Sequence, residues 1–350
     1  MVDEEEVILK LLMFGFTKYE AKVYYALLKH GSLTSTELLK IARIPQARLY
    51  DVIERLVSKG LVKVSRSRPA KYSIINPELA LKSYIEQEMV AKAKIAEDIV
   101  RSVERSGEVV EDSYIWTVSG VHSITVVIRD LVESAEDELL IATYTHLMEK
   151  MMKSLEGVKD KEISTCVILY DKDGKIAENL AFFDEVRFKP TLGPTIILKD
   201  LLKGLLIPRS YRQRPVAYII EDLEILSPII NYFFYLKETS SPIIYRLGED
   251  VRRRRFRSLI RAIEMIQRMQ ENGIEVGVEI EGRWRTSGEP GKIVGKPINA
   301  IRDRYREITS LIVEQNGSRI LVGGRGATYE DFEALRITVY PLNPTADQPG

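Results

Sequence analysis

Apolar residues recur at helical spacing along the first sixty positions and predict four short helices, near residues 4–14, 17–29, from 34 onward, and 46–58. Thr17 precedes Glu20 by three residues, and Thr34 precedes Glu37 in the same way, which is the capping-box pattern that begins a helix. Pro45 suits the start of the fourth helix, because its missing N–H would be unpaired there. In that helix the inward positions at helical spacing are Leu49, Val52, Ile53, Leu56 and Val57.

Two short β-type runs follow the fourth helix, at residues 61–64 and 71–75, with a basic tip at residues 65–69 between them. Three helices, a turn, a further helix and a basic hairpin together predict a winged helix-turn-helix domain over residues 1–76. The fourth helix is the expected recognition helix, because the first residues of such a helix read base edges in the major groove. The expected DNA-binding side chains are Gln46, Arg48, Tyr50, Arg55, Arg66, Arg68 and Lys71.

The distribution of charge along the chain supports the prediction of DNA binding, whereas the net charge does not. The chain has 51 basic and 51 acidic side chains, so its net charge favours no partner. Residues 40–71 hold nine basic and two acidic side chains, which fits a local surface for phosphate. The alternative is a helical module whose basic residues are solvated and whose contacts are with protein.

The same region resembles a known family. The segments GFTKYEAKVYYALLKHG, IPQARLYDVIERLVSKGLV and RPAKYSI are similar to the signature of the TrmB family of archaeal transcriptional regulators. The resemblance is close over about residues 15–85 and continues more diffusely to the C-terminus. It implies a DNA operator as partner.

Residues 77–108 predict one long, charged helix. Ile85, Met89, Lys92, Ala96, Ile99 and Val103 recur at alternating spacings of four and three, the seam of a coiled coil. This seam predicts a homodimer in which paired helices hold two winged domains at the separation of DNA half-sites. The alternative is a single amphipathic helix that lies on its own domain.

Residues 109–272 alternate between strand and helix patterns, which predicts an α/β domain. The opening YIWTVSGVHSITVVIRDLVESAEDELLIAT resembles the phospholipase-D-like domain of the same regulators, and that superfamily's enzymes need paired His-x-Lys motifs. His30, His122 and His146 are the three histidines of the chain, and none has Lys two residues later. We therefore expect no catalysis by that chemistry. The sequence also lacks a Walker loop and a metal-spaced His/Cys cluster, so no metal or cofactor is expected.

Residues 273–345 change to short strands separated by turns, typical of a small β domain. EVGVEIEGRWRTSG, KIVGKPINAI and ILVGGRGATYEDFEALRI resemble the sugar-sensing domain of TrmB-type regulators. The resemblance maps the sugar site to Gly324 and Glu330, and less closely to Asn299 and to Ser227 of the middle domain. The resemblance implies a maltose- or glucose-type sugar, and Asn299 and Ser227 place it at the junction of the last two domains.

The basic run 252–255 with Arg257 and Arg261 permits several roles: a second DNA contact, an anionic ligand site, a solvated face or an interdomain ion pair. The single cysteine, the acidic start MVDEEEV and the lack of an apolar run near about 18 residues predict a cytoplasmic protein without a membrane span.

The sequence thus predicts an α+β multidomain regulator that is not an enzyme: a winged helix, a coiled-coil linker, an α/β phospholipase-D-like domain without its catalytic motif, and a small C-terminal β domain. Its operator affinity is expected to depend on the sugar. The alternatives are an architectural protein that coats DNA without an effector and a phospholipase-D-type nuclease.

Overall fold

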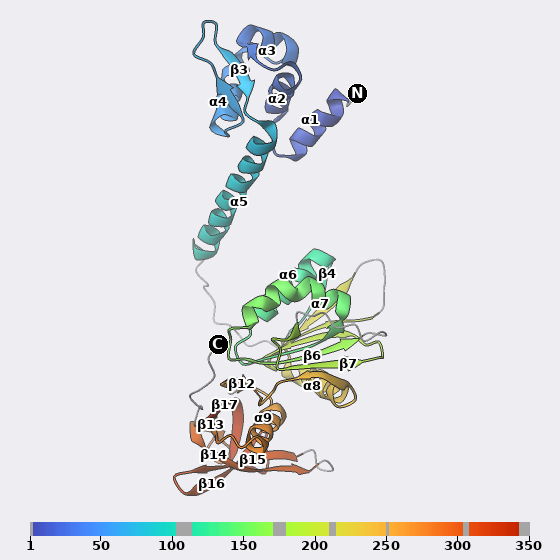
Figure 1. Ribbon diagram of the computed structural model, residues 1–350, viewed down its shortest axis with the longest axis vertical. Coiled ribbons are helices and arrows are strands. Elements are labelled where there is room, and N and C mark those ends of the chain that lie inside the picture. The colour runs from blue at the N-terminus through green and yellow to red at the C-terminus, as the bar shows by residue number, and fades with distance from the viewer. Residues whose placement is uncertain are drawn as a thin grey trace. The chain divides into compact units, whose positions relative to one another are not determined.

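The computed structural model describes residues 3–102, 114–170, 180–209, 215–249, 252–303 and 308–342. They form two compact units that divide near residue 110 (Figure 1). In these described ranges, no helix combines the length and the apolar character that crossing a bilayer requires.

The first unit is a winged helix-turn-helix. Its helices are α1 (Glu4–Met13), α2 (Lys18–His30), α3 (Ser35–Ala42) and α4 (Gln46–Ser58), and its sheet has the order β1 (Leu33–Thr34), β3 (Lys71–Ile74), β2 (Val62–Val64). Strand β1 was not predicted. Both capping boxes are present, at Thr17 with Glu20 and at Thr34 with Glu37. Pro45 is the N-cap of α4, one position before its first helical residue.

Helix α5 (Pro77–Ser102) begins on the winged core and then leaves it. Ala80 and Tyr84 are its buried residues, and both belong to the core of the first unit. The Tyr84 ring lies 6.2 Å from that of Phe14 and 6.4 Å from that of Phe16. The Lys59 ammonium lies over the Tyr84 and Phe16 rings and pairs with the buried Glu20 at 3.0 Å. These contacts fix the direction of α5 relative to the DNA-binding helices.

The second unit begins with a mixed eight-stranded sheet of order β11-β7-β6-β5-β8-β9-β10-β4, which we call the large sheet. Its strands are β4 (Ile115–Ser119), β5 (Glu138–Tyr144), β6 (Ser164–Tyr170), β7 (Glu185–Lys189), β8 (Thr195–Lys199), β9 (Lys203–Ile207), β10 (Val216–Ile220) and β11 (Ser241–Tyr245). The three strands β5, β6 and β7 are parallel, and the other pairings are antiparallel.

Helices cover both faces of the large sheet. Leu139 and Ile141 of β5 face a core with α6 (Val121–Glu133), α7 (Thr145–Leu155) and the short 3₁₀ turn η1 (Glu156–Val158). Their neighbours Leu140 and Ala142 face the opposite core with α8 (Leu223–Glu238). Alternate residues of a strand point to opposite faces, so a continuous apolar run such as that of β5 is what a strand covered on both faces requires.

The rest of the second unit is a small barrel. Its strands are β12 (Arg254–Phe256), β13 (Val276–Trp284), β14 (Pro290–Asp303), β15 (Ile308–Gln315), β16 (Ser318–Gly323) and β17 (Phe332–Pro341). The order is β12-β17-β13-β14-β15-β16, and a short parallel pairing of β16 with β17 closes it. Helix α9 (Leu259–Glu271) packs in the same core. The predicted boundary at residue 273 placed β12 and α9 in the middle domain, whereas they pack with the barrel.

Buried ion pairs join the barrel to the large sheet. Arg261 of α9 pairs with Glu138 of β5 at 3.0 Å, and neither side chain has exposed surface. Arg254 pairs with Asp184 at 2.9 Å. Asp137 receives both Arg257 at 2.6 Å and Arg336 at 2.8 Å. Among the roles left open for the basic run, the structure shows interdomain ion pairing.

Candidate functional site

The winged unit presents an unpaired basic face on α4. Leu49, Val52, Ile53 and Leu56 are buried in the core. Gln46, Arg48, Tyr50 and Arg55 lie on the exposed face, and Tyr50 has 65% of its surface exposed. Within the described part of the chain, the guanidinium groups of Arg48 and Arg55 have no hydrogen bond or ion pair. This face is free to contact phosphates and base edges.

The wing is a hairpin with an ordered tip. The Ser65 amide donates to the Lys71 carbonyl at 2.8 Å, and the Lys71 amide donates to Ser65 Oγ at 2.8 Å. Ser67 Oγ donates to the Pro69 carbonyl at 2.9 Å, which draws the tip into a compact turn. Arg66, Arg68 and Lys71 are all exposed on this hairpin. The structure therefore places all seven predicted DNA-binding side chains at the surface of two elements, α4 and the wing.

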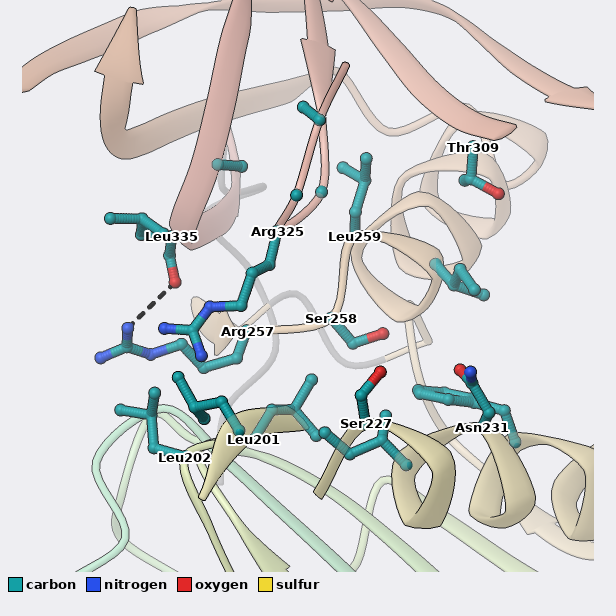
Figure 2. Close-up of a pocket in the computed structure, with 18 of the residues that line it drawn as sticks. Leu201, Leu202, Ser227, Asn231, Arg257, Ser258, Leu259, Thr309, Arg325 and Leu335 are labelled. Carbon is teal, nitrogen blue, oxygen red and sulfur yellow. Dashed lines mark hydrogen bonds between the residues drawn. The ribbon is translucent and has the colours of Figure 1, made fainter. Parts of the chain in front are cut away.

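A cavity of about 440 Å³ lies in the second unit, between the large sheet and the barrel (Figure 2). One wall is a face of α8 with the turn between β8 and β9. The other is the start of α9 with the loop between β16 and β17. The residues that line it and carry polar side chains include Ser227, Asn231, Arg257, Ser258, Thr309, Arg325 and Glu330.

Three of the four predicted sugar-site residues line this cavity: Ser227, Gly324 and Glu330. Glu330 is 5% exposed, and its carboxylate accepts from the Ser310 hydroxyl at 2.7 Å and from the Tyr329 amide at 3.1 Å. The structure does not bring Asn299 to the cavity. Its side chain is exposed beside the irregularity between Pro297 and Asn299, where β14 shifts register against β15.

Several lining residues gave no signal in the sequence. Asn231 lies one helical turn after Ser227 on α8, Ser258 is the N-cap of α9, and Thr309 lies on β15. Among the aromatic residues, Phe234 and Tyr329 line the cavity, whereas Trp284 packs edge-on against Phe332 in the barrel core. Asn231, Ser258 and Thr309 are far apart in the sequence. The closed barrel and the ion pairs that join it to the large sheet bring them together.

No group of three or more metal-ligating side chains occurs in the described ranges. His122 and His146 are exposed on α6 and α7, and His30 lies at the end of α2 in the other unit. The paired arrangement of two histidines that phospholipase-D chemistry needs is not formed by these side chains.

A winged helix-turn-helix with an exposed basic face, joined to a unit that contains a cavity with polar side chains in its lining, is typical of a ligand-responsive DNA-binding regulator. Comparison with known families agrees. Residues 11–78 match the model described as "Sugar-specific transcriptional regulator TrmB", residues 114–243 match the N-terminal subdomain of the TrmB effector-binding domain, and residues 251–342 match the C-terminal subdomain in TrmB/TrmBL1. The chain belongs to the TrmB family of sugar-sensing transcriptional regulators.

Individual relatives extend over most of the chain. The sugar-sensing transcriptional regulator TrmBL1 of Pyrococcus furiosus is 27% identical, over 94% of this chain and 97% of its own length. The DNA-binding transcriptional repressor TrmBL2 of Thermococcus kodakarensis is 29% identical over 51% of this chain and 74% of its own. The family consists of regulators and not of enzymes, which agrees with the prediction from the histidines.

Two solved structures show weaker similarity. The archaeal chromatin protein TrmBL2 covers 69% of this chain and 100% of its own with 21% identity and a TM-score of 0.39. The phospholipase D family member Nuc of Salmonella typhimurium covers 38% of this chain and 99% of its own with 10% identity and a TM-score of 0.33. Both TM-scores lie below 0.5, so neither similarity adds to what the family models show.

Proposed function

We propose that this regulator binds a discrete DNA operator as a homodimer in the cytoplasm and that a sugar in the cavity of the second unit changes its operator affinity. The observation that carries the proposal is the exposed basic face of α4 and the wing, in a chain whose other unit holds a cavity lined in part by polar side chains.

Arginine and glutamine at the start of α4 have the side-chain geometry for specific readout. Arg48 can donate two hydrogen bonds to guanine O6 and N7, and Gln46 can pair with adenine N6 and N7. Arg66 and Arg68 on the wing suit phosphate or minor-groove contacts, which position a protein on the duplex and add affinity for any sequence.

Exposed apolar residues on α5 support the dimer. Ile85, Met89 and Ile99 of the predicted seam are 41%, 67% and 57% exposed in the single chain. Pairing with a second copy would bury them at coiled-coil spacing. Because Tyr84 and Lys59 fix α5 to the winged core, two paired helices would also set the separation of the two recognition helices.

The cavity supports a small polar effector. Its volume of about 440 Å³ lies in the lower part of the range of roughly 300–1,000 Å³ for small-molecule sites, which suits a mono- or disaccharide of the glucose or maltose type. Hydroxyl and amide side chains around it can pair with sugar hydroxyls. For regulation, the ligand must bind the DNA-competent and DNA-incompetent states with different affinity.

Footprinting on genomic fragments tests the DNA half of the proposal. A regulator protects a discrete palindromic site, with half-sites about one helical turn or a multiple apart. An architectural protein, the second candidate, protects DNA uniformly. Uniform protection would show that the chain coats DNA and does not recognise a discrete operator.

A further inference from the structure

Arg325 is a cation without a partner at the wall of the effector cavity. Its neighbours are neutralised: Arg257 pairs with Asp137 at 2.6 Å and donates to the Leu335 carbonyl at 3.0 Å, and Arg283 pairs with Glu333. Within the described residues, the Arg325 guanidinium makes no hydrogen bond and no ion pair. Figure 2 shows it beside the Arg257 guanidinium, reaching from the β16–β17 loop into the cavity.

The surroundings of Arg325 disfavour its charge. Burial lowers the pKa of the Arg325 guanidinium, and the neighbouring Arg257 lowers it further. Glu333 acts in the opposite sense and offsets these effects only in part. A bound anion would supply the missing countercharge.

The loop that carries Arg325 is held in place. The Gly324 carbonyl accepts from the Ala327 amide at 3.1 Å, which closes a turn around Arg325. Gly326 adopts a φ of +78°, a conformation that favours glycine, and its amide donates to Glu333 at 2.8 Å. The guanidinium is thus presented from a turn with its own hydrogen bonds.

The two carboxylates of the cavity are already engaged by the protein. Each oxygen of Glu330 accepts a hydrogen bond, from Ser310 and from the Tyr329 amide. Asp200 accepts from the amides of Asp137 and Glu138 at 2.7 and 2.8 Å. Neutral sugars are commonly held by carboxylates that accept from their hydroxyls, and here the carboxylates have less capacity left for that role.

The polar side chains of the cavity are divided between two ends. Arg325 and Arg257 lie together near Leu335 and Leu202, and the side chains of Ser227, Ser258 and Asn231 lie at the other side (Figure 2). A matching ligand carries a negative charge at one end and hydroxyl groups at the other. We propose that the effector is a phosphorylated sugar, with its phosphate on Arg325 beside Arg257 and its hydroxyls on Ser227, Ser258 and Asn231. This inference rests on the proposed function and names the ligand class of the same cavity.

Isothermal titration calorimetry of the full chain tests the ligand class, with glucose, maltose, glucose 1-phosphate, glucose 6-phosphate, fructose 6-phosphate and inorganic phosphate as separate ligands. We expect at least one sugar phosphate to bind about 10- to 100-fold more tightly than both the matching neutral sugar and inorganic phosphate, the gain from a charge-assisted contact. Arg325→Gln should remove most of that gain. Arg319→Gln, an exposed position on β16 of the same barrel, should leave it unchanged.

The contrary outcomes separate this inference from the proposed function. If neutral sugars bind as tightly as their phosphates and Arg325→Gln has no effect, the phosphorylated class is wrong while the sugar-responsive regulator stands. If inorganic phosphate binds as tightly as any sugar phosphate, the sugar part is not recognised and the inference is wrong. If none of the six ligands binds, both the inference and the effector half of the proposed function fail.

Discussion

Arg48 on α4 and Arg66 on the wing are both exposed and unpaired within the described residues, but they lie on elements with different roles in DNA recognition. A side chain at the start of a recognition helix reads bases, whereas a wing arginine contacts the backbone or the minor groove. Loss of the first should change sequence preference, and loss of the second should change affinity for all sequences.

Arg48→Ala should therefore cost about 1–3 kcal/mol of binding free energy on the operator and little on unrelated DNA. Arg66→Ala with Arg68→Ala should weaken both alike and reduce the magnitude of the log–log salt slope by roughly 0.9 for each lost phosphate contact. Fluorescence anisotropy over a range of salt concentrations measures both quantities. Identical behaviour of the two variants would rule out the assignment of α4 as the recognition helix.

Glu20 gives the winged unit a predictable response to acid. Burial acts to raise the pKa of its carboxyl, but hydrogen bonds from the Thr17 amide and the Lys59 ammonium outweigh it, and the net pKa is lowered. A carboxyl with a lowered folded-state pKa stabilises the fold above its unfolded pKa of about 4.3, and that contribution is lost as the pH falls through the folded value.

Glu20→Gln should lower the free energy of unfolding at neutral pH by about 1–2 kcal/mol and flatten the loss of stability below pH of about 4. Urea denaturation at several pH values, followed by circular dichroism, measures this. Glu54→Gln, an exposed position on α4, is the matched control. An unchanged acid response in Glu20→Gln would show that other carboxyls dominate it.

At the scale of elements, the first turns of α5 are packed on the winged core, and the rest of the helix carries exposed apolar side chains. Met89 falls on the predicted seam and is 67% exposed, while its neighbour Val90 falls outside the seam and is 72% exposed. A charge introduced at Met89 would therefore disturb a coiled-coil interface, whereas the same charge at Val90 reports only the general effect of adding charge to the helix.

Met89→Glu should dissociate the dimer at micromolar concentration, because two carboxylates would meet at the seam, and Val90→Glu should not. Analytical ultracentrifugation of the full chain reports the masses. If Val90→Glu dissociates the dimer and Met89→Glu does not, the helices pair through a different face. If the unmodified chain is monomeric, α5 is not a dimer helix.

The ion pair between Arg261 and Glu138 joins α9 to β5 and is one of the ion pairs that hold the barrel on the large sheet. Removing one member of a buried pair leaves the other charge without a partner, which costs about 3–5 kcal/mol. Exposed pairs contribute about 0–1 kcal/mol, and Arg253 is 44% exposed in its contacts with Glu162 and Glu279.

Arg261→Met should accordingly lower the free energy of unfolding of the second unit by about 3–5 kcal/mol, and Arg253→Met should lower it by less than about 1 kcal/mol. Chemical denaturation followed by tryptophan fluorescence gives both values, since Trp116 and Trp284 lie in this unit. If the two substitutions lower the free energy of unfolding equally, the buried pair does not stabilise the second unit more than the exposed pairs do.

For the whole molecule, local signals made the winged unit predictable. The pairs Thr17–Glu20 and Thr34–Glu37 and the basic hairpin are each complete within a few residues, and the structure confirms these elements. Strand β1, with only two residues, left no comparable pattern.

The cavity could be predicted only in part. The family resemblance located Ser227, Gly324 and Glu330, which do meet, but it also included Asn299, which does not line the cavity. Barrel closure pairs Val322 of β16 with Phe332 of β17 across the loop that carries Arg325, and the ion pair under α9 joins Arg261 to Glu138, 123 positions away in the sequence. Periodicity along the chain carries no record of such contacts, so neither Arg325 nor Ser258 stood out.

Ligand binding in the cavity is expected to set operator affinity, and operator binding by the full chain with and without ligand measures this coupling. In fluorescence anisotropy, at least one of glucose, maltose and glucose 6-phosphate should change the operator Kd by about 5- to 150-fold, the usual range of allosteric coupling, and leave affinity for unrelated DNA much less affected. An operator Kd that stays the same at saturating concentrations of all three would show that the cavity does not control operator affinity.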